Sequence, residues 1–136
     1  MVSGFPKIDP CVNILTVRIR IEASSSLKDR RRVVRSLLDK IRNRWDVSAM
    51  DMGPDNDRSF AVLGFSAIGT SRSMADERLS AVLGFLEDAE GSGTFEVGEI
   101  RERVLKMDDP EETFLRENEY SRAAGETSGF FEPGER

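Results

Sequence analysis

The densest group of charged side chains in this sequence lies in residues 26–45, where eight residues are basic and two are acidic. The apolar residues of this segment recur at helical spacing, which predicts an amphipathic helix. At about 100° per residue, five of the basic residues fall on one flank of the helix, within an arc of roughly 100°. This basic flank consists of Lys28, Arg31, Arg32, Arg35 and Arg42. A cationic surface on one side of a packed helix favours binding to a polyanion.

The same segment carries the signals of a stable helix. Ser26 can serve as the N-cap, and Asp29 three residues later completes a capping-box pattern. Arg35–Asp39 and Asp39–Arg42 are expected as weak pairs at i,i+4 and i,i+3. The apolar stripe that would face a core is Leu27, Val34, Leu37, Leu38, Ile41 and Trp45. A second interpretation therefore stays open, in which the basic flank is simply the solvated face of a packed helix.

Other side chains give no pattern typical of catalysis or of metal binding. The chain has no histidine, which excludes imidazole acid–base catalysis, His-dependent triads and histidine metal ligands. Cys11 is the only cysteine and has no identifiable base beside it, so we interpret it as an incidental thiol. Asp55, Asn56 and Asp57 lack the spacing of a calcium loop and predict a tight turn. We expect no enzyme activity, no cofactor and no metal, and the sequence identifies no small-molecule substrate.

Length and charge predict one domain with two tails. The 136 residues suit a single domain with a core of ordinary size. Residues 107–136 contain nine acidic and three basic residues, whereas residues 1–106 contain 16 acidic and 17 basic ones. We expect an N-terminal lead at 1–11, a domain at 12–106 and an acidic tail at 107–136. The tail is predicted to lack fixed structure, apart from a short helix near residues 111–122.

The cellular compartment is predicted from three features that the sequence lacks. No run of about 18 apolar residues is present, so no membrane span is expected. The first ten residues have neither the basic region nor the apolar region of a signal peptide. With a single cysteine, no internal disulfide can form. These features predict a cytoplasmic protein.

Alternating aliphatic and polar residues predict four strands. They cover residues 15–22, 47–52, 59–68 and 95–105. Between the last two strands, Ser73 with Asp76 three residues later predicts the N-cap of a second helix, which ends near the glycines at 91–93. The order is therefore β-α-β-β-α-β. Right-handed crossovers then predict a ferredoxin-like α+β fold, a four-stranded antiparallel sheet with both helices on one face.

The pattern also predicts the core and the open face of the sheet. The core is expected to contain Leu15, Val17, Ile19, Val34, Leu38, Ile41, Leu63, Phe65, Leu79, Val82 and Leu86. The open face would carry Thr16, Arg18, Arg20, Glu22, Gly64, Ser66 and Ile68. This face lacks the stacked aromatics with which RNA-recognition domains bind single strands. The edge strands, 47–52 and the closing strand, are candidate seams for a two-fold dimer.

Residues 12–105 resemble the YlxP-like family of small, uncharacterised bacterial proteins. The most specific match is SLKDRRRVVRSL at 26–37, followed by IRNRWDVS at 41–48. Leu63-Gly64 and the closing segment from Gly98 to Leu105 also match. Where family members commonly carry an aromatic, a polar and a basic residue before the third strand, this chain has Arg58-Ser59-Phe60. The resemblance implies a ferredoxin-like fold, a homo-oligomer and gene neighbourhoods shared with translation initiation and ribosome maturation genes. It implies no established activity.

Two functions from different classes follow from these observations. The first is a non-enzymatic protein that binds structured RNA or the ribosome, with the basic helix docked on phosphates. The alternative is a protein–protein interaction module that self-associates through a sheet edge and binds no nucleic acid. A further interpretation of the basic flank is that it receives the chain's own acidic tail as an internal mimic of nucleic acid.

Overall fold

The structure is a computed structural model that describes residues 6, 8–22 and 25–107. In chain order the elements are β1 (Cys11–Ile21), α1 (Leu27–Arg44), β2 (Ser48–Asp51), β3 (Phe60–Gly69), α2 (Arg72–Ala89), the short 3₁₀ helix η1 (Glu90–Ser92) and β4 (Phe95–Lys106). Apart from Met107, the predicted acidic tail lies outside the described residues. The chain divides into the units 1–105 and 106–136, and nearly all that follows concerns the first.

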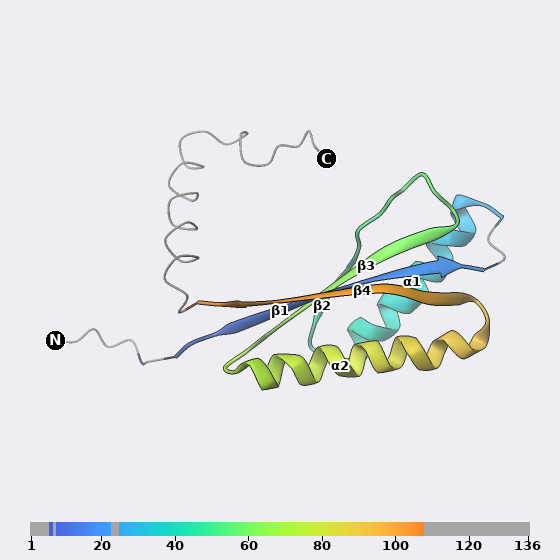
Figure 1. Cartoon of the computed structure of the whole chain (residues 1–136). Helices are drawn as coiled ribbons and strands as arrows, with labels where there is room; N and C mark the ends of the chain where they lie inside the picture. The colour runs from blue at the N-terminus through green and yellow to red at the C-terminus, as the bar shows by residue number, and fades with distance from the viewer. Residues whose placement is uncertain (1–5, 7, 23–24, 108–136) are drawn as a thin grey trace, which may run out of the picture. The chain divides into compact units, whose positions relative to one another are not determined.

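The four strands form one antiparallel sheet in the order β2-β3-β1-β4 (Figure 1). Leu15 of β1 lies opposite Phe65 of β3, and Ala49 of β2 lies opposite the same residue on the other side. The backbone N–H of Glu22 donates to Thr94 O at 2.9 Å, just before β4 begins. With the helices on one face, this arrangement confirms the predicted ferredoxin-like fold.

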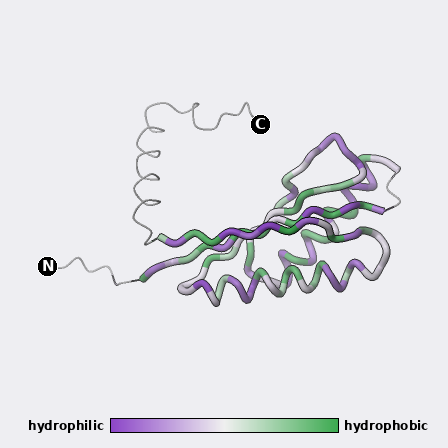
Figure 2. The backbone as a smooth tube through the Cα atoms, in the orientation of Figure 1, coloured by the Kyte–Doolittle hydropathy of each residue, from purple (hydrophilic) through white to green (hydrophobic). Residues whose placement is uncertain are grey.

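The core lies between that face of the sheet and the two helices. Burial alternates along β1, because every second side chain points toward the helices. In Figure 2 the colour changes repeatedly between hydrophobic and hydrophilic along both the strands and the helices. All eleven predicted core residues belong to the buried cluster. In α1 the fully buried members of the predicted stripe are Val34, Leu37, Leu38 and Ile41, while Leu27 and Trp45 are half-buried.

Truncation of the core tests the register of strands and helices. We expect Leu38→Ala or Phe65→Ala to lower the free energy of unfolding by about 2–5 kcal/mol, through lost apolar burial and the cavity left behind. Both side chains are at least 96% buried. Urea denaturation measures the loss, and Lys40→Ala on the exposed side of α1 should stay within about 0.5 kcal/mol of the wild type. A core variant as stable as the Lys40 control would contradict this register.

The start of α2 differs from the prediction. The N-cap is Ser71, whose Oγ accepts from Met74 N at 3.2 Å, and not Ser73. The helix therefore starts at Arg72, two residues earlier than predicted, and the fully buried Ala75 lies four residues before Leu79 on the same stripe. Asp76, expected to complete the cap, instead accepts a hydrogen bond from the side chain of Asn13.

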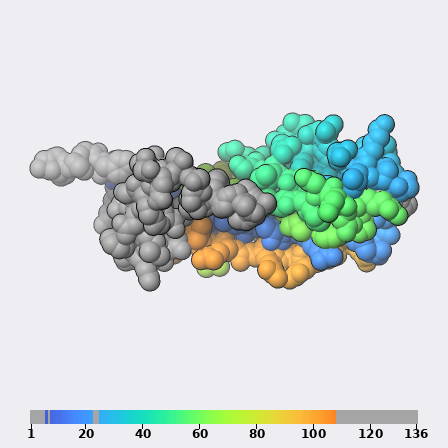
Figure 3. Space-filling model, turned by 90° about the horizontal axis from the view of Figure 1, so that it is seen from above, coloured from blue at the N-terminus to red at the C-terminus, as the bar shows by residue number. Residues whose placement is uncertain are grey.

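The two helices are not placed alike. Figure 3 shows residues of α1 in cyan along one edge of the domain and β4 in orange along the opposite edge. α1 lies beside β2, to which it is joined by hydrogen bonds from Arg30 and Arg42. Neither helix within the described residues is long and apolar enough to cross a membrane.

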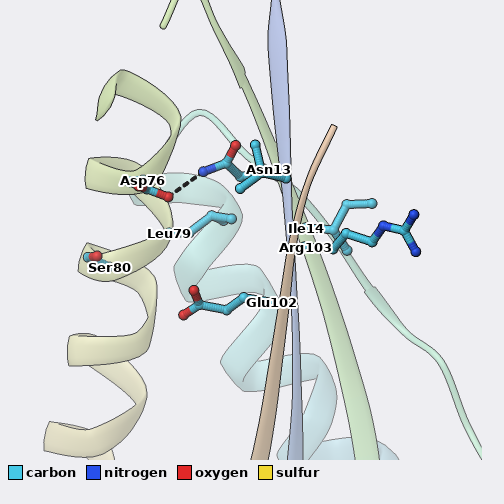
Figure 4. A pocket seen from close by; sticks show the side chains of 8 residues that line it. Asn13, Ile14, Asp76, Leu79, Ser80, Glu102 and Arg103 are labelled. Atoms are coloured by element: carbon cyan, nitrogen blue, oxygen red, sulfur yellow. Dashed lines mark hydrogen bonds between the residues drawn. The ribbon is translucent and has the colours of Figure 1, made fainter. Parts of the chain in front are cut away.

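β4 changes the side that its residues face. Phe95 is buried and Val97 packs on the core, so odd-numbered residues point toward the helices at the start of the strand. Further along, Glu102 lies on the α2 side of the sheet and Arg103 on the opposite side (Figure 4). The alternation of side chains along β4 is therefore not regular between Val97 and Glu102.

Candidate functional site

The cap of α1 fixes the start of the helix that carries the basic flank. Ser26 Oγ accepts from Asp29 N at 3.1 Å, which confirms the predicted N-cap. The carboxylate of Asp29 reaches back one residue further than in a standard capping box, and accepts from Ser25 N at 3.1 Å and Ser25 Oγ at 2.7 Å. The hydrogen bond from the Ser25 hydroxyl is the main cause that lowers the pKa of Asp29. A charged carboxylate therefore stabilises the first turn.

The structure brings all five residues of the basic flank to the surface of α1. Each is exposed, because the opposite stripe of the helix is buried in the core. Arg32 lies 3.3 Å from Asp29 and Arg42 lies 3.5 Å from Asp39, as nitrogen-to-oxygen distances. Lys28, Arg31 and Arg35 form no ion pair with any residue that the structure describes, so the expected Arg35–Asp39 pair is not made. The flank thus presents three uncompensated cations and two weakly paired ones.

Another arginine of the same helix, Arg30, has a different role that the sequence analysis missed. Its side chain is only 2% exposed. Its Nη1 and Nη2 atoms donate to the two carboxylate oxygens of Asp51 at 2.8 and 3.0 Å, and its Nε donates to Phe60 O at 3.1 Å. This bidentate pair ties α1 to the end of β2 and to the start of β3. Arg30 is therefore a structural residue, while its neighbours in the run face solvent.

The partner of Arg30 is held in its charged form. Burial by itself would raise the pKa of Asp51, but this is outweighed by the hydrogen bonds from Arg30 and from Gly53 N, together with the charge of Arg30. The net effect lowers the pKa of Asp51. The distance from Gly53 N to Asp51 Oδ1 is 2.8 Å. Asp51 thus joins α1, β2 and the following turn through one carboxylate.

The Arg58-Ser59-Phe60 element lies where the turn at 55–57 enters β3. Asp57 accepts from Ser59 N at 2.8 Å and from the Ser59 hydroxyl, which is the main cause that lowers the pKa of Asp57. Phe60 points to the open face of the sheet, where the guanidinium of Arg18 lies 4.1 Å from the centre of its ring. The predicted tight turn is therefore stabilised by a carboxylate, and the aromatic ring that follows it is already covered.

A small cleft of about 180 Å³ lies between α2 and the strands β1 and β4 (Figure 4). Asn13, an almost completely buried amide, donates its side-chain N–H to Asp76, which also lies 3.5 Å from Arg72. The Sγ atom of Cys11, also buried, lies 3.4 Å from the other end of the same amide. These contacts satisfy the buried polar group and join β1 to α2. Within the described part of the chain, no group of three or more histidine, cysteine or acidic residues is placed to hold a metal ion.

Fold and surface together define a small ferredoxin-like α+β domain with an exposed basic helix. The chain belongs to the DUF503 family of proteins of unknown function, whose family model matches residues 12–99. It is similar to the uncharacterised protein YlxP of Bacillus subtilis (strain 168), with 28% identity over 64 residues that cover 47% of this chain and 70% of that protein. Among solved structures it is similar to the de novo designed protein Foldit4, at a TM-score of 0.40 and 15% identity, covering 69% of this chain and 96% of that one.

Proposed function

We propose that the basic flank of α1 binds the phosphate backbone of structured RNA. The role is one of binding and not of catalysis, and we place it in the cytoplasm. The proposal rests on the different positions of the basic residues of α1. Arg30 is buried and paired, while the five cations of the flank are exposed to solvent on one side of the helix. Because the family resemblance implies gene neighbourhoods shared with ribosome maturation genes, ribosomal RNA is the first candidate ligand.

The basic flank is long enough, and has enough weakly paired or unpaired cations, to contact several phosphates. At a rise of 1.5 Å per residue, the distance along the helix from Lys28 to Arg42 is about 21 Å. The ion pairs of Arg32 and Arg42 are exposed, and surface pairs of this kind contribute at most about 1 kcal/mol, so a phosphate can displace the carboxylate. Lys28 lies in the first turn, where the helix dipole repels cations. Its charge therefore does not serve the stability of the helix.

The mode of binding follows from which surfaces remain available. The apolar stripe of α1 is buried, so the helix offers charges and no aromatic stacking platform to a ligand. On the open face of the sheet, the ring of Phe60 is covered by Arg18. Recognition through charge and the shape of a folded RNA is therefore favoured over stacking of unpaired bases.

Salt dependence tests whether RNA binding rests on this flank. Binding that neutralises several phosphates releases the counterions condensed on them. In a fluorescence titration with ribosomal RNA fragments, the logarithm of the association constant should fall with the logarithm of salt concentration with a slope of magnitude about 3–5. Wild-type protein that shows no binding at low salt, or binding with no salt dependence, would contradict the proposal.

A further inference from the structure

The two edge strands of the sheet, β2 and β4, differ in length. β2 is only four residues long, and one of its carbonyl groups, Ala49 O, accepts a hydrogen bond from Arg42 Nη2 of α1 at 2.5 Å. β4 forms the other edge and is twelve residues long. Native proteins usually shorten, cover or charge such edges, because unpaired backbone groups invite another strand. Of the two edges, β4 is therefore the one that is long enough to accept a further strand.

The open part of β4 begins after Val97. The backbone N–H of Val97 donates to Glu90 Oε2 at 3.0 Å, so the start of the strand is capped by η1. From Gly98 to Arg103 every side chain is exposed. Arg101 Nε lies 3.0 Å from Glu99 Oε2, which places these two side chains on the same side of the strand, with Ile100 between them. This stretch alternates an acid, an aliphatic residue and a base.

We propose that two copies of this protein pair through antiparallel β4 strands, with the two-fold axis at Ile100. In this register Glu99 of each copy lies opposite Arg101 of the other, and the two Ile100 side chains lie opposite each other. Opposite charges on facing strands stabilise an antiparallel pair, and so do facing apolar side chains. An isologous contact of this kind uses the same patch on both copies and joins the two sheets into one.

The neighbouring registers are disfavoured by charge. With the axis at Glu99, two Glu99 side chains face each other. With the axis at Arg101, two arginines face each other, although Glu99 then lies opposite Arg103. Like charges directly opposite on neighbouring strands are destabilising. Of these three registers, the one centred on Ile100 places no like charges opposite each other.

Self-pairing is independent of the proposed RNA binding. α1 and β4 lie along opposite edges of the domain (Figure 3), so pairing through β4 leaves the basic flank of each copy exposed. The association of two copies would also place two basic flanks on one particle. Failure of either proposal therefore leaves the other standing, and the two are measured by different assays.

Charge reversal tests the register directly. Sedimentation equilibrium of the wild-type full chain should show a species of twice the monomer mass of 15.2 kDa. Glu99→Arg places an arginine opposite Arg101 of the other copy, and Arg101→Glu places a glutamate opposite Glu99. The dissociation constant of each single variant should therefore rise by about tenfold or more. An equimolar mixture of the two variants restores opposite charges at both positions and should recover the dimer as a heterodimer.

Glu87→Arg is the matched control, since it reverses an exposed acid of α2 away from the edge and should leave the dimer unchanged. Circular dichroism melts of all variants establish that the fold is retained, because the substitutions are on the surface. A wild type that stays monomeric would overturn the proposal. So would single variants that dimerise like the wild type, or a mixture of the two variants that remains monomeric.

Discussion

Replacing Asp51 with Asn should lower the free energy of unfolding by about 3–5 kcal/mol, because it leaves the buried charge of Arg30 without its partner. Arg30 is 2% exposed and makes two hydrogen bonds to that carboxylate, so its charge is compensated chiefly by Asp51. Arg30→Met should be similarly costly, since Asp51 and Phe60 O then lose their donors. Urea denaturation followed by circular dichroism measures both losses.

Asp55→Asn is the control, because it neutralises an exposed carboxylate in the same turn region and should change stability by less than about 0.5 kcal/mol. The double variant Arg30→Met, Asp51→Asn removes both charges, and should lose less than the sum of the two single variants. If Asp51→Asn is as stable as the Asp55 control, the pair does not hold α1 to β2.

The pH dependence gives the same pair an independent signature. The pKa of Asp51 is lowered in the folded protein and returns to its ordinary value of about 3.9 on unfolding. The stabilisation is therefore complete above the unfolded pKa, and it is lost as the pH falls through the folded pKa. Between about pH 5 and pH 2, the wild type should lose more stability than Asp51→Asn, measured as the difference between the two unfolding curves.

Much of the fold could be predicted because periodicity and capping residues act locally. The alternation in β1 and the spacing of Val34, Leu38 and Ile41 each indicated the buried face correctly. The predicted start of α2 was wrong because Ser71 and Ser73 both fit a cap, and Asp76 three residues after Ser73 favoured the later one. The change of face along β4 was not predicted either.

The helical spacing places Arg30 on the buried stripe of α1, although the run of arginines around it suggested a surface position. Arg30 lies four residues before Val34 and seven before Leu37, so it falls within the apolar stripe of α1. In a run of three arginines this position looked like surface charge. Its partner Asp51 is 21 residues away and on another element, so no local pattern indicated the pair. A charged residue at a core position of a helix is the signal that would have found it.

The sequence analysis placed the basic flank correctly on the surface of α1. Whether the flank binds RNA is tested by removing its charges. Replacing Arg31, Arg32 and Arg35 together by Gln keeps helix propensity nearly constant and removes three charges from the flank. Because these side chains are exposed, the fold should survive. Affinity for ribosomal RNA fragments should fall by about tenfold or more, and the salt slope should decrease by about 2–3.

The matched control removes the same number of charges from exposed helix positions outside the flank, at Lys40, Arg44 and Arg72. Lys40 and Arg44 lie on α1 itself, so the comparison separates the flank from the helix as a whole and from net charge. The decisive measurement is a fluorescence anisotropy titration of both triple variants and the wild type at two ionic strengths. The flank variant should lose about tenfold or more in affinity while the control stays within about twofold of the wild type. Equal losses in the two variants, or no loss in the flank variant, would contradict RNA binding through the basic flank of α1.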